Sequence, residues 1–244
     1  MSTDHIVTSF DEELSQLSDL LNRMGGLAES QLENSIEALQ KRDSSLAEDA
    51  IESDRRIDEL HMEVDEMAIR LLALRQPMAG DLRHIVTALK VAPIVERIGD
   101  YSKNVAKRTI ALNQMPAVKP IFTIPRMGRM VREMTKDVLD AFSNNDVAMA
   151  REVWTRDKEV DEMYDSLFRE LLTYMMEDAR NITACTHLLF VARNIERVGD
   201  LATNIAELIY YQVEGVALDE DRPKVDQASV TVVEPDGAPR RESP

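Results

Sequence analysis

Two short segments carry pairs of carboxylates at a spacing that suits cation binding. Glu96-Arg97-Ile98-Gly99-Asp100 returns 100 residues later as Glu196-Arg197-Val198-Gly199-Asp200. In a helix, residues i and i+4 project from the same face, so each copy aligns its glutamate with its aspartate. Like charges at this spacing destabilise a helix by about 0.2–0.5 kcal/mol. The repeated motif therefore predicts a bound cation, or another positive partner, in each half of the chain.

A further acidic pair precedes each motif. Asp54 and Asp58 lie in a segment, 54–59, that resembles 157–162 with its Asp157 and Asp161. Short turns make consecutive helices antiparallel, so the two pairs of each half could face one another. Clustered carboxylates suit hard cations such as iron(III), magnesium, manganese or calcium. The candidate ligands are Asp54, Asp58, Glu96, Asp100, Asp157, Asp161, Glu196 and Asp200, with the amide oxygens of Asn104 and Asn204 as possible additions.

These carboxylates could instead be ordinary solvated faces of acidic helices. Glycine argues against this for the repeated motif, because alanine would be more stable by about 1 kcal/mol at Gly99 and Gly199. Their presence predicts close helix packing beside the carboxylates. His61 and His84 each follow an aspartate at i+3, but the second half has no histidine at either matching position. We interpret both as surface or interface residues rather than ligands.

The elements that must position these residues are helical. Apolar residues recur with a helical period over six long segments, which predicts an all-α protein made of two tandem three-helix bundles of antiparallel helices. Gly25-Gly26 falls inside the first segment and predicts a kink or the close approach of another backbone. The predicted helices span about 6–40, 45–75, 81–113, 125–142, 147–176 and the stretch from a weak break at 178–181 to 214.

A proline-containing linker at 114–125 separates the two predicted bundles. We therefore assign residues 1–116 to the first bundle, 117–215 to the second and 216–244 to a tail. The tail lacks a helical period and contains four of the nine prolines, which predicts disorder. Its segment 229–233 could alternatively form a strand on a partner.

Composition narrows the classes of function. The net charge of −16 argues against nucleic-acid binding, which needs a basic surface. Cys185 is the single cysteine, which excludes an intrachain disulfide, favours a reducing compartment and suits a buried thiol in an apolar helical run. The N-terminus has no signal-peptide pattern and no apolar stretch approaches about 18 residues. We expect a cytoplasmic protein.

Longer stretches surround these motifs, namely Gln76-Pro77-Met78-Ala79-Gly80-Asp81-Leu82-Arg83, Ala88-Leu89-Lys90-Val91, 96–101, 190–200 and Asn204-Ile205-Ala206-Glu207. Together they resemble the PhoU family of phosphate-transport accessory and phosphate-signalling proteins. The likeness covers about Phe10 to Gly215. One departure lies in the first half, where Ile94-Val95 stands in place of the family's Asp-Leu before Glu-Arg. It predicts a first site that is weaker, differently shaped or used for packing.

The resemblance implies two three-helix bundles whose acidic motifs hold metal clusters, of iron, zinc, magnesium or manganese. It also implies a cytoplasmic regulator, expected to be a homodimer, that contacts the ATPase subunit of the phosphate ABC transporter and the phosphate-sensing histidine kinase. Such a protein would reach the membrane only through these partners. It would act as a phosphate-dependent negative regulator of phosphate uptake and of phosphate-starvation genes.

Two other classes of function stay open on the residues alone. A helical-bundle metalloenzyme, such as a carboxylate-bridged oxidase or a phosphohydrolase, would use the same acidic clusters, and so would a metal-storage protein. The sequence shows no phosphate-binding glycine loop, dinucleotide fingerprint or nucleophile elbow. We therefore expect a non-enzymatic signalling adaptor.

Overall fold

The computed structural model describes residues 2–118 and 122–218, with side chains from Phe10 onward. In these ranges the chain is all-helical and contains no strand, which confirms the predicted fold class. The predicted weak break before the last helix is a short 3-10 turn. The elements are α1 (Ser2–Lys41), α2 (Ser44–Glu52), α3 (Asp54–Arg75), α4 (Ala79–Asn113), α5 (Thr123–Asn144), α6 (Val147–Glu177), η1 (Ala179–Asn181) and α7 (Ile182–Glu214).

The second predicted helix is interrupted at Ser53, which separates α2 from α3. The Ala50 carbonyl would normally accept the hydrogen bond of residue 54 in a continuous helix. Instead it accepts bonds from the Ser53 hydroxyl and from Gln31 Nε2, each at 2.9 Å. A side chain from α1 thus competes with the helical ladder directly before Asp54, a competition that helical periodicity does not reveal.

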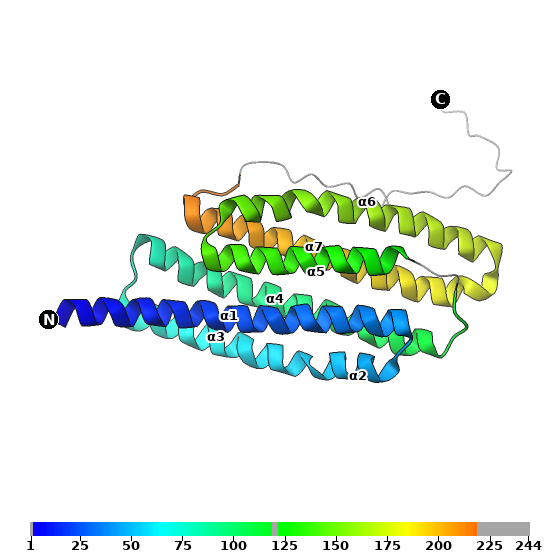
Figure 1. Ribbon diagram of the computed structural model, residues 1–244, viewed down its shortest axis with the longest axis horizontal. Helices are drawn as coiled ribbons and strands as arrows, with labels where there is room; N and C mark the ends of the chain where they lie inside the picture. Colours follow the sequence, from blue (N-terminus) through cyan, green and yellow to red (C-terminus); the bar gives the residue numbers. More distant parts are fainter. Residues whose placement is uncertain (1, 119–121, 219–244) are drawn as a thin grey trace, which may run out of the picture.

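The two halves lie side by side and pack through equivalent helices. In Figure 1 the helices of the first half, blue to teal, lie together below those of the second half, green to orange. α1 packs on α5 and α4 packs on α7, while α2, α3 and α6 lie outside this central set. One continuous hydrophobic core includes buried residues of both halves, such as Met24 of α1 and Met134 of α5. The halves are therefore repeats that share a core.

The α1–α5 contact is built reciprocally around two glycines. A Cβ atom on Gly25 would lie 2.2 Å from Leu139 Cδ1, and one on Gly128 would lie 2.3 Å from Ile36 Cδ1. Gly25 and Ile36 of the first half correspond to Gly128 and Leu139 of the second at one common offset in sequence. The close approach at Gly25 is thus made by a side chain, whereas a kink or a backbone was expected. Gly26 has nothing within 4 Å of such an atom.

Of the remaining predictions, the structure confirms one and leaves others untested. Cys185 is buried, as predicted. The boundary predicted at 116–117 lies in the connection between α4 and α5, and it stays a prediction. Beyond Leu218 the predicted disordered tail, including 229–233, lies outside the described residues. Among the helices that the structure describes, none combines the length and apolar character needed to cross a membrane.

Candidate metal centre

The structure brings the predicted carboxylates together in two groups, one in each half. We name Asp54, Asp58, Glu96 and Asp100 of α3 and α4 the first acidic site, and Asp157, Asp161, Glu196 and Asp200 of α6 and α7 the second acidic site. The other three carboxylates of each site all raise the pKa of its glutamate through charge repulsion. The four carboxylates of each site are therefore close enough to interact.

The motif glycines allow this approach. A Cβ atom on Gly199 would lie 3.0 Å from Asp157 Oδ1. A Cβ atom on Gly99 would lie 3.1 Å from Gln31 Oε1 and 3.5 Å from Asp54 Oδ1. Gly199 thus lets α6 place Asp157 against its motif. At Gly99 the tightest neighbours are Ile57 Cδ1, at 3.0 Å, and Gln31, whereas Asp54 lies at an ordinary contact distance. This agrees with the close packing predicted from the two glycines.

The second acidic site is deeply buried. Asp157, Asp161 and Glu196 are only 1%, 5% and 4% exposed. Glu196 Oε1 accepts a hydrogen bond of 2.9 Å from Arg193, but its buried Oε2 has no hydrogen-bond partner in the described part of the chain. Burial, followed by the charge of Asp200, raises the pKa of Glu196 to about 7, against the opposing effect of Arg193. This carboxyl group is therefore partly protonated near neutral pH, and a further cation beside Oε2 would favour its ionised form.

The first acidic site already contains a cation. The Lys103 ammonium forms an ion pair with the buried Asp54 and lies 3.6 Å from Asp100 Oδ1. Burial, and next to it the charge of a neighbouring carboxylate, raises the pKa of Asp58 and of Glu96. A pocket of about 480 Å³ beside Asp54, Asp58 and Lys103 opens this site to solvent. An amino group thus supplies here part of the charge that a metal ion would supply.

The two acidic sites have different residues at equivalent positions of the repeat. Lys103 corresponds to Thr203, whose hydroxyl donates to the Asp200 carbonyl at 2.8 Å. Arg193 corresponds to Pro93, which lies inside α4. Each half therefore places one basic residue beside its carboxylates, but from opposite ends of the motif. Lysine meets the buried aspartate in the first half, and arginine meets the glutamate in the second.

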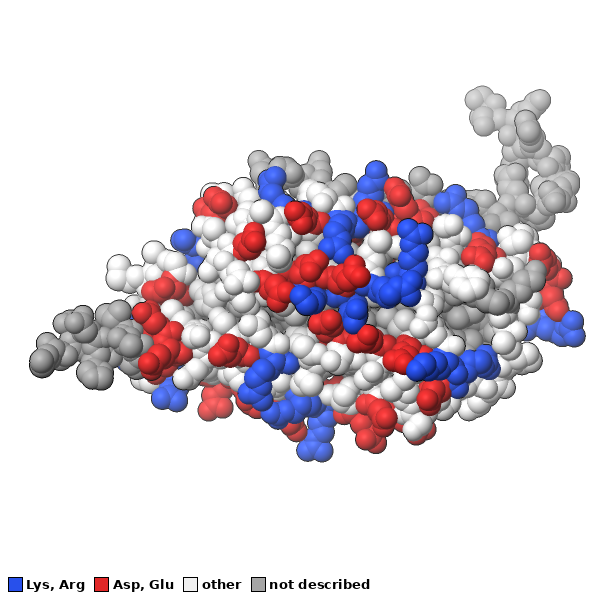
Figure 2. Space-filling model, in the orientation of Figure 1, with Lys and Arg blue, Asp and Glu red and all other residues white. Residues whose placement is uncertain are grey.

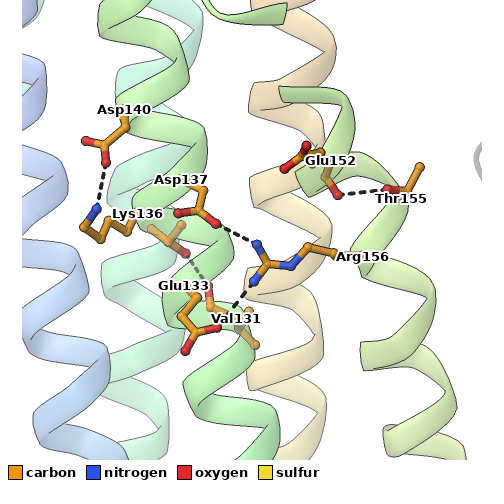
Figure 3. Close-up of polar contacts among 9 residues, drawn as sticks. Val131, Glu133, Lys136, Asp137, Asp140, Glu152, Thr155 and Arg156 are labelled. Carbon is orange, nitrogen blue, oxygen red and sulfur yellow. Dashed lines mark hydrogen bonds and ion pairs between the residues drawn. The ribbon is translucent and has the colours of Figure 1, made fainter. Parts of the chain in front are cut away.

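Carboxylates on the outer faces of the helices have basic partners, in contrast to Glu196 Oε2 of the second acidic site. In Figure 3, Arg156 of α6 reaches Asp137 at 2.6 Å and Glu133 at 3.5 Å, while Lys136 pairs with Asp140 at 2.8 Å. Figure 2 shows the same interspersion of basic and acidic side chains over one face of the molecule. Ordinary surface carboxylates of this chain thus have nearby cations, in contrast to the buried Glu196 Oε2.

The two asparagines proposed as additional ligands and the two histidines differ in their positions relative to the acidic sites. Asn104 is exposed, and Asn204 lines a groove between α4 and α7. No described contact joins either asparagine to the carboxylates. The charge of His61 lowers the pKa of Glu96 and of Asp58, so this histidine lies beside the first acidic site. His84 stacks on Phe142 of α5, which makes it an interface residue, as predicted.

The sequence analysis did not identify three residues that lie near the sites. Lys103 and Arg193 carry the internal positive charges described above. Asp165 is 4% exposed and follows Asp161 by four residues on α6, so the two lie on the same helix face. The spacing Asp157, Asp161, Asp165 was a visible signal for a longer acidic row. No comparable spacing distinguishes the two basic residues from other surface lysines and arginines.

The oxygen donors suit a hard cation, but the side chains are not arranged to coordinate one. Within the described residues, no group of three or more histidine, cysteine, aspartate or glutamate side chains is arranged to hold a metal ion. The second acidic site offers carboxylate oxygens alone, which favours magnesium, manganese or iron(III) over softer ions. Metal binding there would require the carboxylates to rotate toward a common point.

Glu196 gives the protein a pH dependence that can be measured. Its pKa rises from 4.5 to about 7 on folding, so between these values the folded state holds a proton that the unfolded state has released. The unfolding free energy of metal-free protein should therefore fall as pH rises through this window. We expect this fall to shrink by on the order of 2–3 kcal/mol in Glu196→Gln. Urea denaturation at pH 5 and pH 8, with Glu159→Gln at an exposed position of α6 as the control, measures it. Equal pH dependence in Glu196→Gln and the wild type would contradict it.

Comparison with known proteins identifies the family. The PhoU domain matches twice, over residues 21–109 and 124–209. A phosphate-specific transport system accessory protein PhoU homolog of Caulobacter vibrioides is 51% identical over 93% of this chain and 99% of its own length. The crystal structure of PhoU from Pseudomonas aeruginosa aligns with a TM-score of 0.82 and 40% identity, covering 85% of this chain and all of that one. That of the phosphate transport system regulatory protein PhoU from Streptococcus pneumoniae aligns with a TM-score of 0.80 and 27% identity, over 86% of this chain and all of that one. The chain, with its two repeats and paired acidic motifs, belongs to the PhoU family.

Proposed function

We propose that this protein is a non-enzymatic regulator of phosphate homeostasis, which restrains phosphate uptake and phosphate-starvation gene expression when phosphate is plentiful. The observation that carries the proposal is the 51% identity to a phosphate-specific transport accessory protein over 93% of the chain. The aligned stretch of 228 residues spans both repeats. The regulatory protein from Streptococcus pneumoniae, named for the same system, supports the same role.

The mode of action that we propose is docking. The protein would act in the cytoplasm and link the ATPase subunit of the phosphate ABC transporter to the phosphate-sensing histidine kinase. Met62 and Ile69 of α3 are 65% and 61% exposed and lie seven residues apart, on one face of the helix. Exposed apolar side chains grouped on a helix face are typical of protein-binding surfaces. A second copy of the chain is a further expected partner, in a homodimer.

Metal binding is the second part of the proposal. We assign a cation to the second acidic site, held by Asp157, Asp161, Glu196 and Asp200, and a weaker one to the first. The buried Glu196 Oε2 without a partner supports this ranking, as does Lys103, which partly neutralises the first site. A bound cation would neutralise the carboxylates and tie α6 to α7. Magnesium, manganese and iron fit the donors best, and zinc is a further candidate.

Affinity capture tests the docking role. Tagged full-length protein, purified from phosphate-replete cells, should carry the transporter ATPase and the histidine kinase at levels well above a tag-only control, as measured by quantitative mass spectrometry. Because the proposed restraint operates under plentiful phosphate, the yield of partners should differ in phosphate-starved cells. Recovery of neither partner after mild cross-linking would contradict the proposal.

A further inference from the structure

A polar pocket lies beside the last turn of α7, the orange end of that helix in Figure 1. It has a volume of about 550 Å³, which lies in the range typical of small-molecule sites. Its walls come from α1 and α4 of the first half and from the ends of α5 and α7 of the second, so both repeats contribute to it. We name it the inter-repeat pocket. Its polar lining includes Ser18, Asp19, Asp81, His84, Asn145 and Gln212.

A hydrogen-bond network among these residues leaves one buried acceptor without a partner. Gln212 Nε2 donates to Asn145 Oδ1 at 2.6 Å and to His84 Nδ1 at 3.0 Å. Because Nδ1 accepts, the proton of the neutral ring lies on Nε2, which donates to the Ser18 hydroxyl at 2.9 Å. Gln212 is only 4% exposed, and its Oε1 has no hydrogen-bond partner in the described part of the chain. A buried acceptor of this kind costs stability, and a ligand that donates to it would remove that cost.

The repeat contains an equivalent pocket that is apolar at matching positions. This second pocket, of about 530 Å³, lies where α4 and α5 are connected. At the offsets that relate the two halves, it has Leu112, Ala184 and Phe122 in place of Gln212, His84 and Asp19, respectively. The repeated fold therefore accepts apolar side chains at these positions. Packing alone does not account for the polar residues of the inter-repeat pocket.

The charge of the inter-repeat pocket favours a cation. Asp19 of α1 and Asp81 of α4 line it and are exposed, and neither forms an ion pair with a described residue. None of its described lining residues is lysine or arginine. Burial lowers the pKa of His84, against the opposing effect of the Asp81 charge, so the imidazole is uncharged at neutral pH. The pocket therefore suits a positively charged ligand with N–H donors and disfavours an anion.

We propose that the inter-repeat pocket binds a small organic amine, whose ammonium groups pair with Asp19 and Asp81 and donate a hydrogen bond to Gln212 Oε1. The two carboxylates come from different helices, so a diamine can meet one with each end. Such a ligand would contact α1 and α4 of one half and α7 of the other. Binding would therefore strengthen the contact between the repeats.

Calorimetric titration of the full-length protein with putrescine, a four-carbon diamine, tests the proposal. We expect one bound putrescine per chain in addition to any weak binding to the acidic surface. The neutral analogue 1,4-butanediol and inorganic phosphate should both give no measurable binding, because neither supplies a positive charge. Binding of phosphate to the pocket, or equal binding of the diol and the diamine, would overturn the proposal.

Two pocket variants locate the diamine. Gln212→Leu introduces the residue of the equivalent position and should weaken putrescine binding about tenfold, as expected for the loss of a hydrogen bond to a charged group. Asp19→Asn with Asp81→Asn changes only exposed positions and should weaken binding by at least as much, with circular dichroism to confirm that both variants fold.

Two further variants serve as controls. Glu48→Gln with Asp49→Asn makes the same change in net charge on exposed positions of α2, which does not line the pocket, and should bind putrescine almost as the wild type does. Asp161→Ala with Glu196→Ala and Asp200→Ala should also retain binding. An equal loss in the α2 variant would indicate general attraction to an acidic surface. Loss of binding in the second-acidic-site variant, with retention in the pocket variants, would place the amine there instead. Either result would overturn the proposal.

Discussion

Replacing Asp161, Glu196 and Asp200 together by alanine is expected to remove most of the metal that we propose binds this protein. The second acidic site is where a cation would relieve most repulsion, because Asp157, Asp161 and Glu196 are buried and Glu196 Oε2 has no partner among the described residues. Removal of these carboxylates also removes their mutual repulsion, so the variant should fold without metal. Elemental analysis by mass spectrometry of the purified proteins measures the metal content, and circular dichroism checks the helix content.

A matched variant in the first half provides the control. Asp58→Ala with Glu96→Ala and Asp100→Ala changes the equivalent residues of the first acidic site, where Lys103 already pairs with Asp54 and lies near Asp100. We expect this variant to lose less metal than the other. Unchanged metal content in the second-half variant would contradict the metal proposal. A greater loss from the first-half variant would reverse the order of the two sites.

The fold was predictable because the sequence contains two copies of the same helical pattern and acidic motif. Helical periodicity identified the long helices, and the repeated motif set the register between the halves. Gly99 and Gly199 even indicated which faces approach closely, because a glycine inside a helix costs stability that only packing explains. The interruption at Ser53 was not predictable, because it depends on Gln31, a residue of another helix that competes for the Ala50 carbonyl.

The candidate site was predictable in its acidic residues and not in its basic ones. An i, i+4 carboxylate pair is a local pattern, so Glu196 and Asp200 could be found by spacing alone. The partners of those carboxylates depend on which side chains the packing leaves nearby. Thr203 and Lys103 occupy equivalent positions, yet only the lysine can form an ion pair. Sequence spacing alone did not indicate that the first site contains its own cation.

Deletion of the gene is expected to raise expression of phosphate-starvation genes severalfold while phosphate is still plentiful. The reason is the proposed restraint on the sensor kinase and the transporter, which would be lost with the protein. A reporter fused to a starvation promoter, read in phosphate-rich medium in the wild type, the deletion strain and a complemented strain, measures the effect. Normal repression in the deletion strain would contradict the regulatory proposal.

A chain that ends at Gly215 should restore repression in the deletion strain. Both matched repeats end by residue 209, so the truncated chain keeps each acidic site and the helices that carry it. The proposed docking face on α3, with the exposed Met62 and Ile69, also stays in place, so the restraint should persist. A shorter chain that lacks the second repeat should fail to restore repression, since α4 and α1 would lose the helices they pack on. Failure of the chain ending at Gly215, with normal protein levels by immunoblot, would show that the last 29 residues take part in the restraint.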